Sequence, residues 1–249
     1  MKDRSQRSYK SFSHWRSILL LSGCLLPVFL FMAVCFGNDV FIVFESDKPS
    51  RSIGTAANGR LENGKRLPAR GENFRAYSCL GTLIGRNAVH HRVRECVLDA
   101  YGMMEEKYPH KVFVYGETGR PSGGEFKPHK THQNGLCVDF MVPVTEEDGG
   151  SVPLPASVFN KFGYGMEFDS AGKSNGLRID FEAMAEHIAA LHVSAGRHGL
   201  KIRRIIFDPE LQPLLFKTPA GKKIKSEISF SKKRSWVRHD EHYHVEFGL

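Results

Sequence analysis

Cysteine is scarce in this sequence, which contains five cysteines in 249 residues. Cys24 and Cys35 lie in an apolar N-terminal stretch, so the rest of the chain has Cys79, Cys96 and Cys137. An odd number of cysteines allows at most one disulfide among these three, and we expect it between Cys79 and Cys96. A multiply bridged scaffold is therefore excluded, and the 41% of residues that are hydrophobic must supply the core.

Charged residues are absent from residues 17–37. The preceding flank, residues 1–16, contains five Lys or Arg and a single acid. An apolar stretch of roughly 20 residues is long enough to cross a bilayer, and a basic flank stays in the cytoplasm. Residues 1–37 are therefore predicted to be a signal peptide or an uncleaved membrane anchor, with the remaining chain in the periplasm. The segment LSGC also resembles a lipoprotein processing box, which would place a lipid on Cys24.

The exported part of the chain has little excess charge. The whole sequence contains 35 Lys and Arg against 27 Asp and Glu, and removing the basic flank leaves 30 bases against 26 acids. A net charge of this size gives no support to a nucleic-acid partner. Six basic residues do cluster between positions 222 and 234, which we interpret as a solvated charged face. We expect contact with a membrane only through the N-terminal segment.

No internal repeat divides the chain, and residues 48–75 show neither helical nor strand periodicity. We therefore expect three parts. Residues 1–37 form the signal peptide or anchor, residues 38–75 form an extended or mobile linker, and residues 76–249 form one folded domain.

Hydrophobic periodicity within that domain predicts a mixture of helices and strands. Helices are expected over residues 92–108 and around residues 181–191, where apolar side chains recur at helical spacing. Strands are expected over residues 111–115, 135–144, 202–207 and 243–247, with a further strand around Met166. Because regular strand–helix–strand alternation is missing, we predict an α+β fold with a central, mainly antiparallel sheet flanked by helices.

Two histidine-containing segments have the spacing of a metal site. In THQNGLCVDF, residues 131–140, His132 precedes Asp139 by seven positions, and the predicted strand projects Asp139 from a rigid element. In HDEHYHVEF, residues 239–247, strand alternation places His242, His244 and Glu246 on one face. Imidazole and carboxylate ligands suit zinc. A proton relay, a structural zinc site or an exposed polar face would show the same pattern.

The segments at residues 116–140 and 239–247 resemble the penicillin-insensitive murein endopeptidases, in the wider metallopeptidase group of lysostaphin, the D-Ala-D-Ala carboxypeptidases and hedgehog domains. The resemblance covers the chain from about residue 77 to the C-terminus. It implies that His132, Asp139 and His244 bind zinc and that His242 is the catalytic histidine. It also implies that His129 and His239 line the same cleft on the sheet.

The sequence departs from this family pattern in one respect that concerns metal binding. The family has a further Asp and His that hold a second metal, whereas the comparable segment FDSAGKSNG offers Asp169 and no histidine. We therefore expect one zinc ion. The glycine-rich run over residues 116–124 lacks the Gly-Lys-Ser/Thr ending of a phosphate loop, so it is interpreted as a wall of the cleft in which Arg120 could meet a substrate carboxylate.

The resemblance implies an exported, zinc-dependent hydrolase that cuts the peptide cross-links of peptidoglycan, at the bond from D-alanine to diaminopimelate. A zinc D,D-carboxypeptidase is the first alternative, because Glu241 stands three residues before His244, as the general base does in those relatives. A wall-binding domain with a vestigial zinc site is the second alternative. Strand alternation favours His242 over Glu241 as the group that handles the proton of the attacking water, unless the strand begins only after Glu241.

Overall fold

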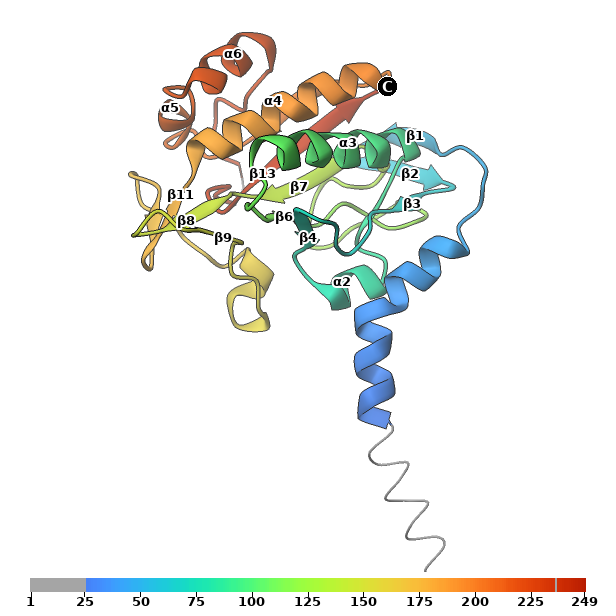
Figure 1. The fold of residues 1–249 in the computed structure, drawn as a ribbon. Coiled ribbons are helices and arrows are strands. Elements are labelled where there is room, and N and C mark those ends of the chain that lie inside the picture. Colours follow the sequence, from blue (N-terminus) through green and yellow to red (C-terminus); the bar gives the residue numbers. More distant parts are fainter. Residues whose placement is uncertain (1–25, 236) are drawn as a thin grey trace, which may run out of the picture.

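The computed structural model describes residues 26–235 and 237–249 (Figure 1). The basic flank and the lipoprotein box predicted at Cys24 lie outside these residues. A helix spans Leu26–Val43. The elements that follow it are, in chain order, β1 (Arg51–Thr55), β2 (Asn58–Glu62), β3 (Lys65–Arg66), β4 (Phe74–Ala76), α2 (Cys79–Leu83), β5 (Ala88–Val89), α3 (His91–Lys107), β6 (Phe113–Tyr115), β7 (Cys137–Met141), β8 (Val144–Glu146), β9 (Ser151–Val152), the 3-10 helix η1 (Val158–Gly163), β10 (Lys173–Ser174), β11 (Leu177–Ile179), α4 (Phe181–Arg197), β12 (Lys201–Ile206), α5 (Gln212–Leu215), α6 (Pro219–Glu227) and β13 (His242–Gly248).

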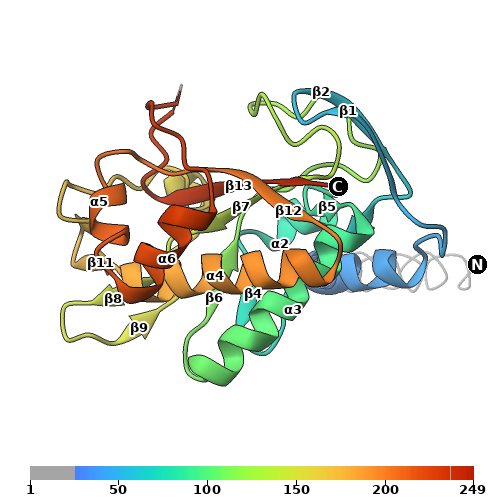
Figure 2. The same cartoon turned by 90° about the horizontal axis from the view of Figure 1, so that it is seen from above.

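A five-stranded sheet forms the centre of the molecule, with its strands in the order β12, β13, β7, β6 and β4. The first three neighbouring pairs are antiparallel, and β6 and β4 are parallel. Helices α3 and α4 pack against each other on one side of this sheet, as the two views in Figures 1 and 2 show. The combination of helices with mixed sheets is the α+β class predicted from the sequence.

The core lies between the central sheet and the two long helices. Helix α3 turns its predicted apolar face inward, and helix α4 is capped by Asp180, whose carboxylate accepts a hydrogen bond from the Ala183 N–H at 3.0 Å. Phe140 of β7 and Tyr243 of β13 stack at 5.5 Å beneath His187 of α4. These contacts hold β7 and β13 in place from the helical side.

The disulfide predicted between Cys79 and Cys96 is wrong, because both thiols are free. Cys96 is buried in α3, where its sulfur lies 3.7 Å from the carbonyl oxygen of Leu191 in α4. Cys79 begins α2 and is exposed. The two cysteines therefore contribute to different parts of the fold, which their spacing in the sequence did not reveal.

Two predicted strands differ from the structure. The strand expected over residues 135–144 is divided, since β7 ends at Met141 and Val144 begins β8 in a separate four-stranded sheet. Pro143 lies between them and has no N–H with which to continue the ladder. The strand expected around Met166 is a loop in which the methionine side chain is buried.

Residues 48–75, for which we expected no regular structure, contain all or part of four strands. Strands β1 and β2 form an antiparallel pair, β3 pairs with β5, and β4 joins the central sheet. Leu61, Leu67 and Phe74 in this stretch are buried. The absence of strand periodicity was therefore misleading, because strands as short as these do not repeat their pattern. The division of the chain into anchor, linker and domain stays a prediction.

Candidate metal centre

Strands β7 and β13 bring predicted site residues together on one face of the central sheet. His244 of β13 is directly opposite Asp139 of β7 in the strand register. His242 lies two residues before His244 and so points to the same side, while Tyr243 points into the core beneath α4. The site therefore occupies the face of the sheet that is turned away from α3 and α4.

Two buried histidines approach one oxygen of the buried Asp139 carboxylate. The Nε2 atom of His132 lies 3.3 Å from Asp139 Oδ1, and the Nδ1 atom of His244 lies 2.8 Å from the same oxygen. The other ring nitrogen of His132, Nδ1, donates to the carbonyl oxygen of Thr118 at 3.0 Å. This hydrogen bond fixes the imidazole orientation and leaves Nε2 free to act as a ligand.

The chemistry of these side chains fits a metal ion. His132 and Asp139 are completely buried, yet the Nε2 atom of His132 has no hydrogen-bond partner among the described residues. An unpaired buried nitrogen next to a carboxylate is costly unless a cation joins them. Burial lowers the pKa of His244 to about 4. Burial opposes ionisation of Asp139, but the neighbouring His132 and His242 hold its pKa well below the usual value. Neutral imidazole and ionised carboxylate are the forms that bind zinc.

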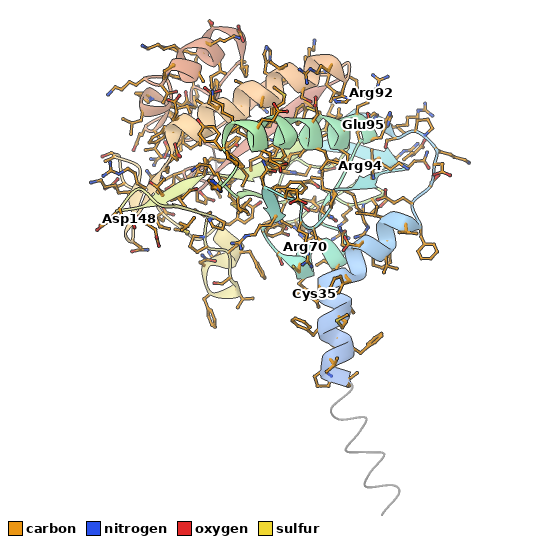
Figure 3. All side chains as sticks on the ribbon, viewed as in Figure 1. Cys35, Arg70, Arg92, Arg94, Glu95 and Asp148 are labelled. Carbon is orange, nitrogen blue, oxygen red and sulfur yellow. The ribbon has the colours of Figure 1, made fainter. Side chains whose placement is uncertain are left out.

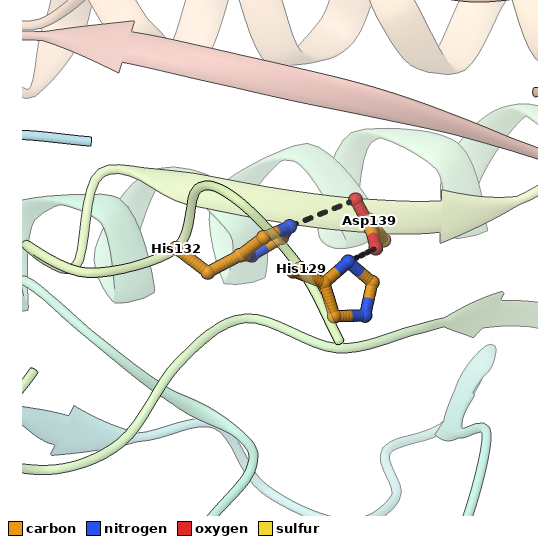
Figure 4. A group of neighbouring side chains, drawn as sticks. All are labelled: His129, His132 and Asp139. Carbon is orange, nitrogen blue, oxygen red and sulfur yellow. Dashed lines mark ion pairs between the residues drawn. The ribbon is translucent and has the colours of Figure 1, made fainter. Parts of the chain in front are cut away.

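His129 is another histidine close to Asp139. Figure 4 shows His129, His132 and Asp139, which each present a ligand atom within 4.8 Å of the others. The Nδ1 atom of His129 lies 3.9 Å from Asp139 Oδ2, and its Nε2 atom lies 2.5 Å from Glu117 Oε2. Because the Glu117 carboxylate engages its Nε2 atom, His129 is the ion-pair partner of Glu117 in the cleft, whether or not it also contacts a metal.

Two glycines in the run at residues 116–124 permit the close approach of the site residues. A Cβ atom on Gly119, whose φ is +150°, would lie 2.7 Å from the carbonyl oxygen of His132. A Cβ atom on Gly116 would lie 2.4 Å from the hydroxyl oxygen of Tyr164 and 3.0 Å from the Cβ of Asp139. Real Cβ atoms are not found at such distances, so this run forms a backbone wall against the site.

Tyr164 and Glu117 are site residues that the sequence did not indicate. The hydroxyl of Tyr164 donates to Asp139 Oδ2 at 3.0 Å and accepts from the backbone N–H of Glu117 at 2.8 Å. The Glu117 carboxylate also accepts hydrogen bonds from Tyr77 and Arg86. Burial opposes its ionisation, but Arg86 and His129 lower the pKa of Glu117 to about 2. Tyr164 is 25 residues from Asp139 and follows no motif, so only the fold brings the two together.

Replacing Tyr164 with phenylalanine is expected to weaken zinc binding by about 10- to 100-fold, because Asp139 loses the donor that orients its second oxygen. Competition with a chromogenic chelator measures this affinity. Tyr108→Phe is the matched control, since Tyr108 follows α3 and does not line the cleft. Equal zinc affinity in Tyr164→Phe and Tyr108→Phe would show that the hydroxyl does not support the metal ligands.

The relation between His242 and Glu241 follows the exception to the strand-alternation argument. Strand alternation separates these two side chains only if both belong to the strand, and β13 begins at His242. Glu241 is 5% exposed, and its Oε1 atom lies 2.8 Å from the Nδ1 atom of His242. Burial raises the pKa of Glu241 to about 8 and lowers that of His242 to about 4. The two residues therefore form one buried acid–base pair.

A cleft of about 700 Å³ opens over the site. Its lining includes the predicted residues His129, His239, Glu241, His242 and His244. The ring of His239 lies 4.5 Å from that of His242, between centroids. The cleft thus gathers the second histidine-containing segment and the loop before β7 around one space.

Arg120 and Asp169 lie elsewhere. Arg120 is exposed and does not belong to the lining of the cleft, whereas Arg86 does and bonds to Glu117. Asp169 accepts hydrogen bonds from the backbone N–H groups of Ala171 and Lys173 in a separate loop. A contact between Arg120 and a substrate in the cleft is therefore not supported by its position.

Comparison with known proteins was made by family and by individual sequence. A search of curated proteins finds no matching sequence. The family described as penicillin-insensitive murein endopeptidase matches residues 52–248. The match includes every side chain of the candidate metal centre and the whole of the central sheet. It begins after the helix at Leu26–Val43, which is outside the matched region. The chain belongs to the penicillin-insensitive murein endopeptidase family.

Proposed function

We propose that this protein is an exported, zinc-dependent murein endopeptidase that hydrolyses the peptide cross-links of peptidoglycan. The observation that carries the proposal is the buried group of His132, Asp139 and His244, in which both imidazoles approach one oxygen of Asp139 and His244 lines the cleft, in a chain of this peptidase family. Family membership supports peptidoglycan as the substrate. The proposal further specifies that the protein binds one zinc ion and that it cuts the bond from D-alanine to diaminopimelate.

His132, Asp139 and His244 would hold the zinc ion, which supplies a water of lowered pKa and polarises the scissile carbonyl when it is bound. His242 is placed to accept the proton of the attacking water and to return it to the leaving amine. Its Nε2 atom faces the ligand group, 3.8 Å from Asp139 Oδ2, while Nδ1 contacts Glu241. Glu241 thereby sets the tautomer and orientation of His242.

A zinc D,D-carboxypeptidase is the second candidate, favoured by the burial of Glu241 at the floor of the cleft beside His242. In that enzyme class the glutamate would act on the water itself. The substrate would then be an uncross-linked stem peptide that loses its terminal D-alanine.

Purified cross-linked and uncross-linked muropeptides separate these functions by the masses of their products. We expect zinc-loaded protein to convert cross-linked dimers to monomers and to leave the terminal D-alanine of monomers in place. Removal of D-alanine alone would establish the carboxypeptidase. Absence of both products, together with retention of the protein on isolated cell walls, would identify a wall-binding domain. His132→Ala protein serves as the control for contaminating hydrolases.

A further inference from the structure

The end of the N-terminal helix Leu26–Val43 is bound to the folded body. Asn38 is 1% exposed, and its side-chain amide donates to the carbonyl oxygen of Leu67 at 3.1 Å. The Asn38 side-chain oxygen accepts from Asn87 at 2.9 Å. Leu67, which follows β3, and Asn87, which precedes β5, are thus paired with a residue that a signal peptidase would remove or expose if it cut near the end of the apolar stretch.

Further contacts surround this junction. Arg70 donates to the backbone carbonyl of Cys35 at 2.9 Å, and Figure 3 shows these two residues beside each other where the helix meets the body. The guanidinium of Arg66 lies 4.5 Å from the ring centroid of Phe41. Beyond the helix, Glu45 pairs with Arg94 at 2.9 Å. Interactions on both sides of Asn38 therefore give the helix a defined direction relative to the domain.

The other end of the helix is exposed in the part of the chain that the structure describes. The described helix has 18 residues with a mean hydropathy of 2.1, and 6% of them are buried. Phe29 and Phe31 are 69% and 66% exposed. A helix that is apolar on all sides requires an apolar environment on all sides, which a bilayer supplies and a single protein partner does not. At 1.5 Å per residue, Leu26 lies about 18 Å from Asn38 along the helix.

The level of the bilayer surface follows from the sequence and from one contact. Residues 17–37 contain no charge, and Asn38 and Asp39 are the first polar residues after them. A Cβ atom on Gly37 would lie 2.4 Å from Leu83 Cδ1 in α2. Helix α2 therefore lies beside the point at which the apolar stretch leaves the body. If the helix crosses a bilayer, the hydrocarbon ends at this level.

Exposed apolar side chains continue along the same side of the molecule. Leu80 in α2 and Ile84 just after it are 48% and 64% exposed, and Val158 and Phe159 at the start of η1 are 64% and 97% exposed. In Figure 1, α2 and the segment between β9 and β11 extend on the side of the N-terminal helix, whereas α4, α5 and α6 lie on the other side. We call Leu80, Ile84, Val158 and Phe159 the membrane face.

We propose that the N-terminal helix is retained as an anchor and that the membrane face rests on the surface of the same lipid bilayer. Leu80 and Ile84 also line the cleft, as do Lys161 and Phe162 of η1. The cleft consequently opens at the bilayer surface, and its substrate is a peptide presented close to the membrane. Only this last statement rests on the proposed function.

Fluorescence quenching by lipids tests the position of the membrane face. Full-length protein, with Cys24, Cys35 and Cys79 replaced by serine, is labelled at Phe159→Cys or Ile84→Cys with an environment-sensitive dye. It is reconstituted in phosphatidylcholine and phosphatidylglycerol vesicles that contain a headgroup nitroxide lipid. Val193→Cys is the matched control, because Val193 is an apolar residue of α4 that is 42% exposed on the opposite side.

We expect the nitroxide to remove most of the fluorescence at positions 159 and 84 and to leave position 193 unchanged. Equal fluorescence at all three positions would overturn the proposal. Efficient energy transfer between labelled copies without quenching would also overturn it, because it would show that a second copy of the chain covers the membrane face. Quenching needs neither metal nor substrate, so it remains measurable in a protein that hydrolyses nothing.

The mature N-terminus provides an independent measurement in cells. We expect protein extracted from the membrane fraction to keep residues 26–37, as detected by intact mass. A mature chain that starts near Asn38 would overturn retention of the anchor. Asn38→Ala in the same vesicles is expected to reduce quenching at position 159, because the angle between the helix and the domain is no longer held by the contacts to Leu67 and Asn87.

Discussion

Alanine at His132 or Asp139 is expected to weaken zinc binding by more than about 10²-fold and to abolish hydrolysis of the cross-link, because each removes one of three proposed ligands. Partners that merely orient a ligand contribute about 10- to 100-fold in affinity, so a ligand itself should contribute more. Both side chains are completely buried. Zinc content after dialysis, measured by atomic absorption, checks the result. A stoichiometric ion in either variant would remove that residue from the ligand group.

Zinc content also tests whether His244 is the third ligand. His244→Ala is expected to lose zinc, because the Nδ1 atom of His244 and the Nε2 atom of His132 approach the same oxygen of Asp139. His129→Ala is the control and is expected to retain zinc, because its Nε2 is already engaged by Glu117. The reverse order would place His129 in the ligand group and His244 in the cleft wall.

Complete removal of metal by a chelator should also abolish hydrolysis in the unaltered protein, and added zinc should restore it. Full activity in metal-free protein would contradict the proposed chemistry. Restoration by another divalent ion but not by zinc would contradict the identity of the metal alone.

His242→Ala is expected to retain zinc and to lose turnover by about 10²- to 10⁴-fold, which is the usual contribution of a positioned acid–base group. His242 lies next to the ligands but is not one of them in the proposed arrangement, since its Nδ1 atom contacts Glu241. Turnover and zinc content are measured on the same preparation. A loss of zinc that parallels the loss of turnover would make His242 a ligand.

Glu241→Gln is expected to lower turnover by about 10- to 100-fold, as for other partners that orient a functional histidine. If Glu241 acts only through His242, the double variant is no slower than His242→Ala. Losses that multiply in the double variant would show that Glu241 handles the proton independently. That outcome, with a larger effect of Glu241→Gln than of His242→Ala, would favour the carboxypeptidase.

The amino-acid sequence predicted correctly several features that depend on residues close together in the chain. The helices near residues 92–108 and 181–191 follow from periodicity, because each buries one face. The last two strands also lie close to their predicted ranges, although β13 is buried along nearly its whole length. The order and spacing of the two histidine-containing segments indicated the family, which the match over residues 52–248 confirmed. Strands β1 and β2 escaped prediction because they are largely exposed and show no alternation of apolar and polar residues, and β3 escaped because two residues are too few for a pattern.

By itself the sequence identified His132, Asp139 and His244 as candidate zinc ligands, through the resemblance to the murein endopeptidases, and it showed an uncharged stretch at residues 17–37. Only the tertiary structure decided which other side chains join them. Tyr164 reaches Asp139 from 25 residues away, and Asn38 pairs with Asn87 across 49 residues. The start of β13 at His242 decided that Glu241 turns into the cleft. Such contacts depend on how strands and loops pack in space, and no local pattern encodes them.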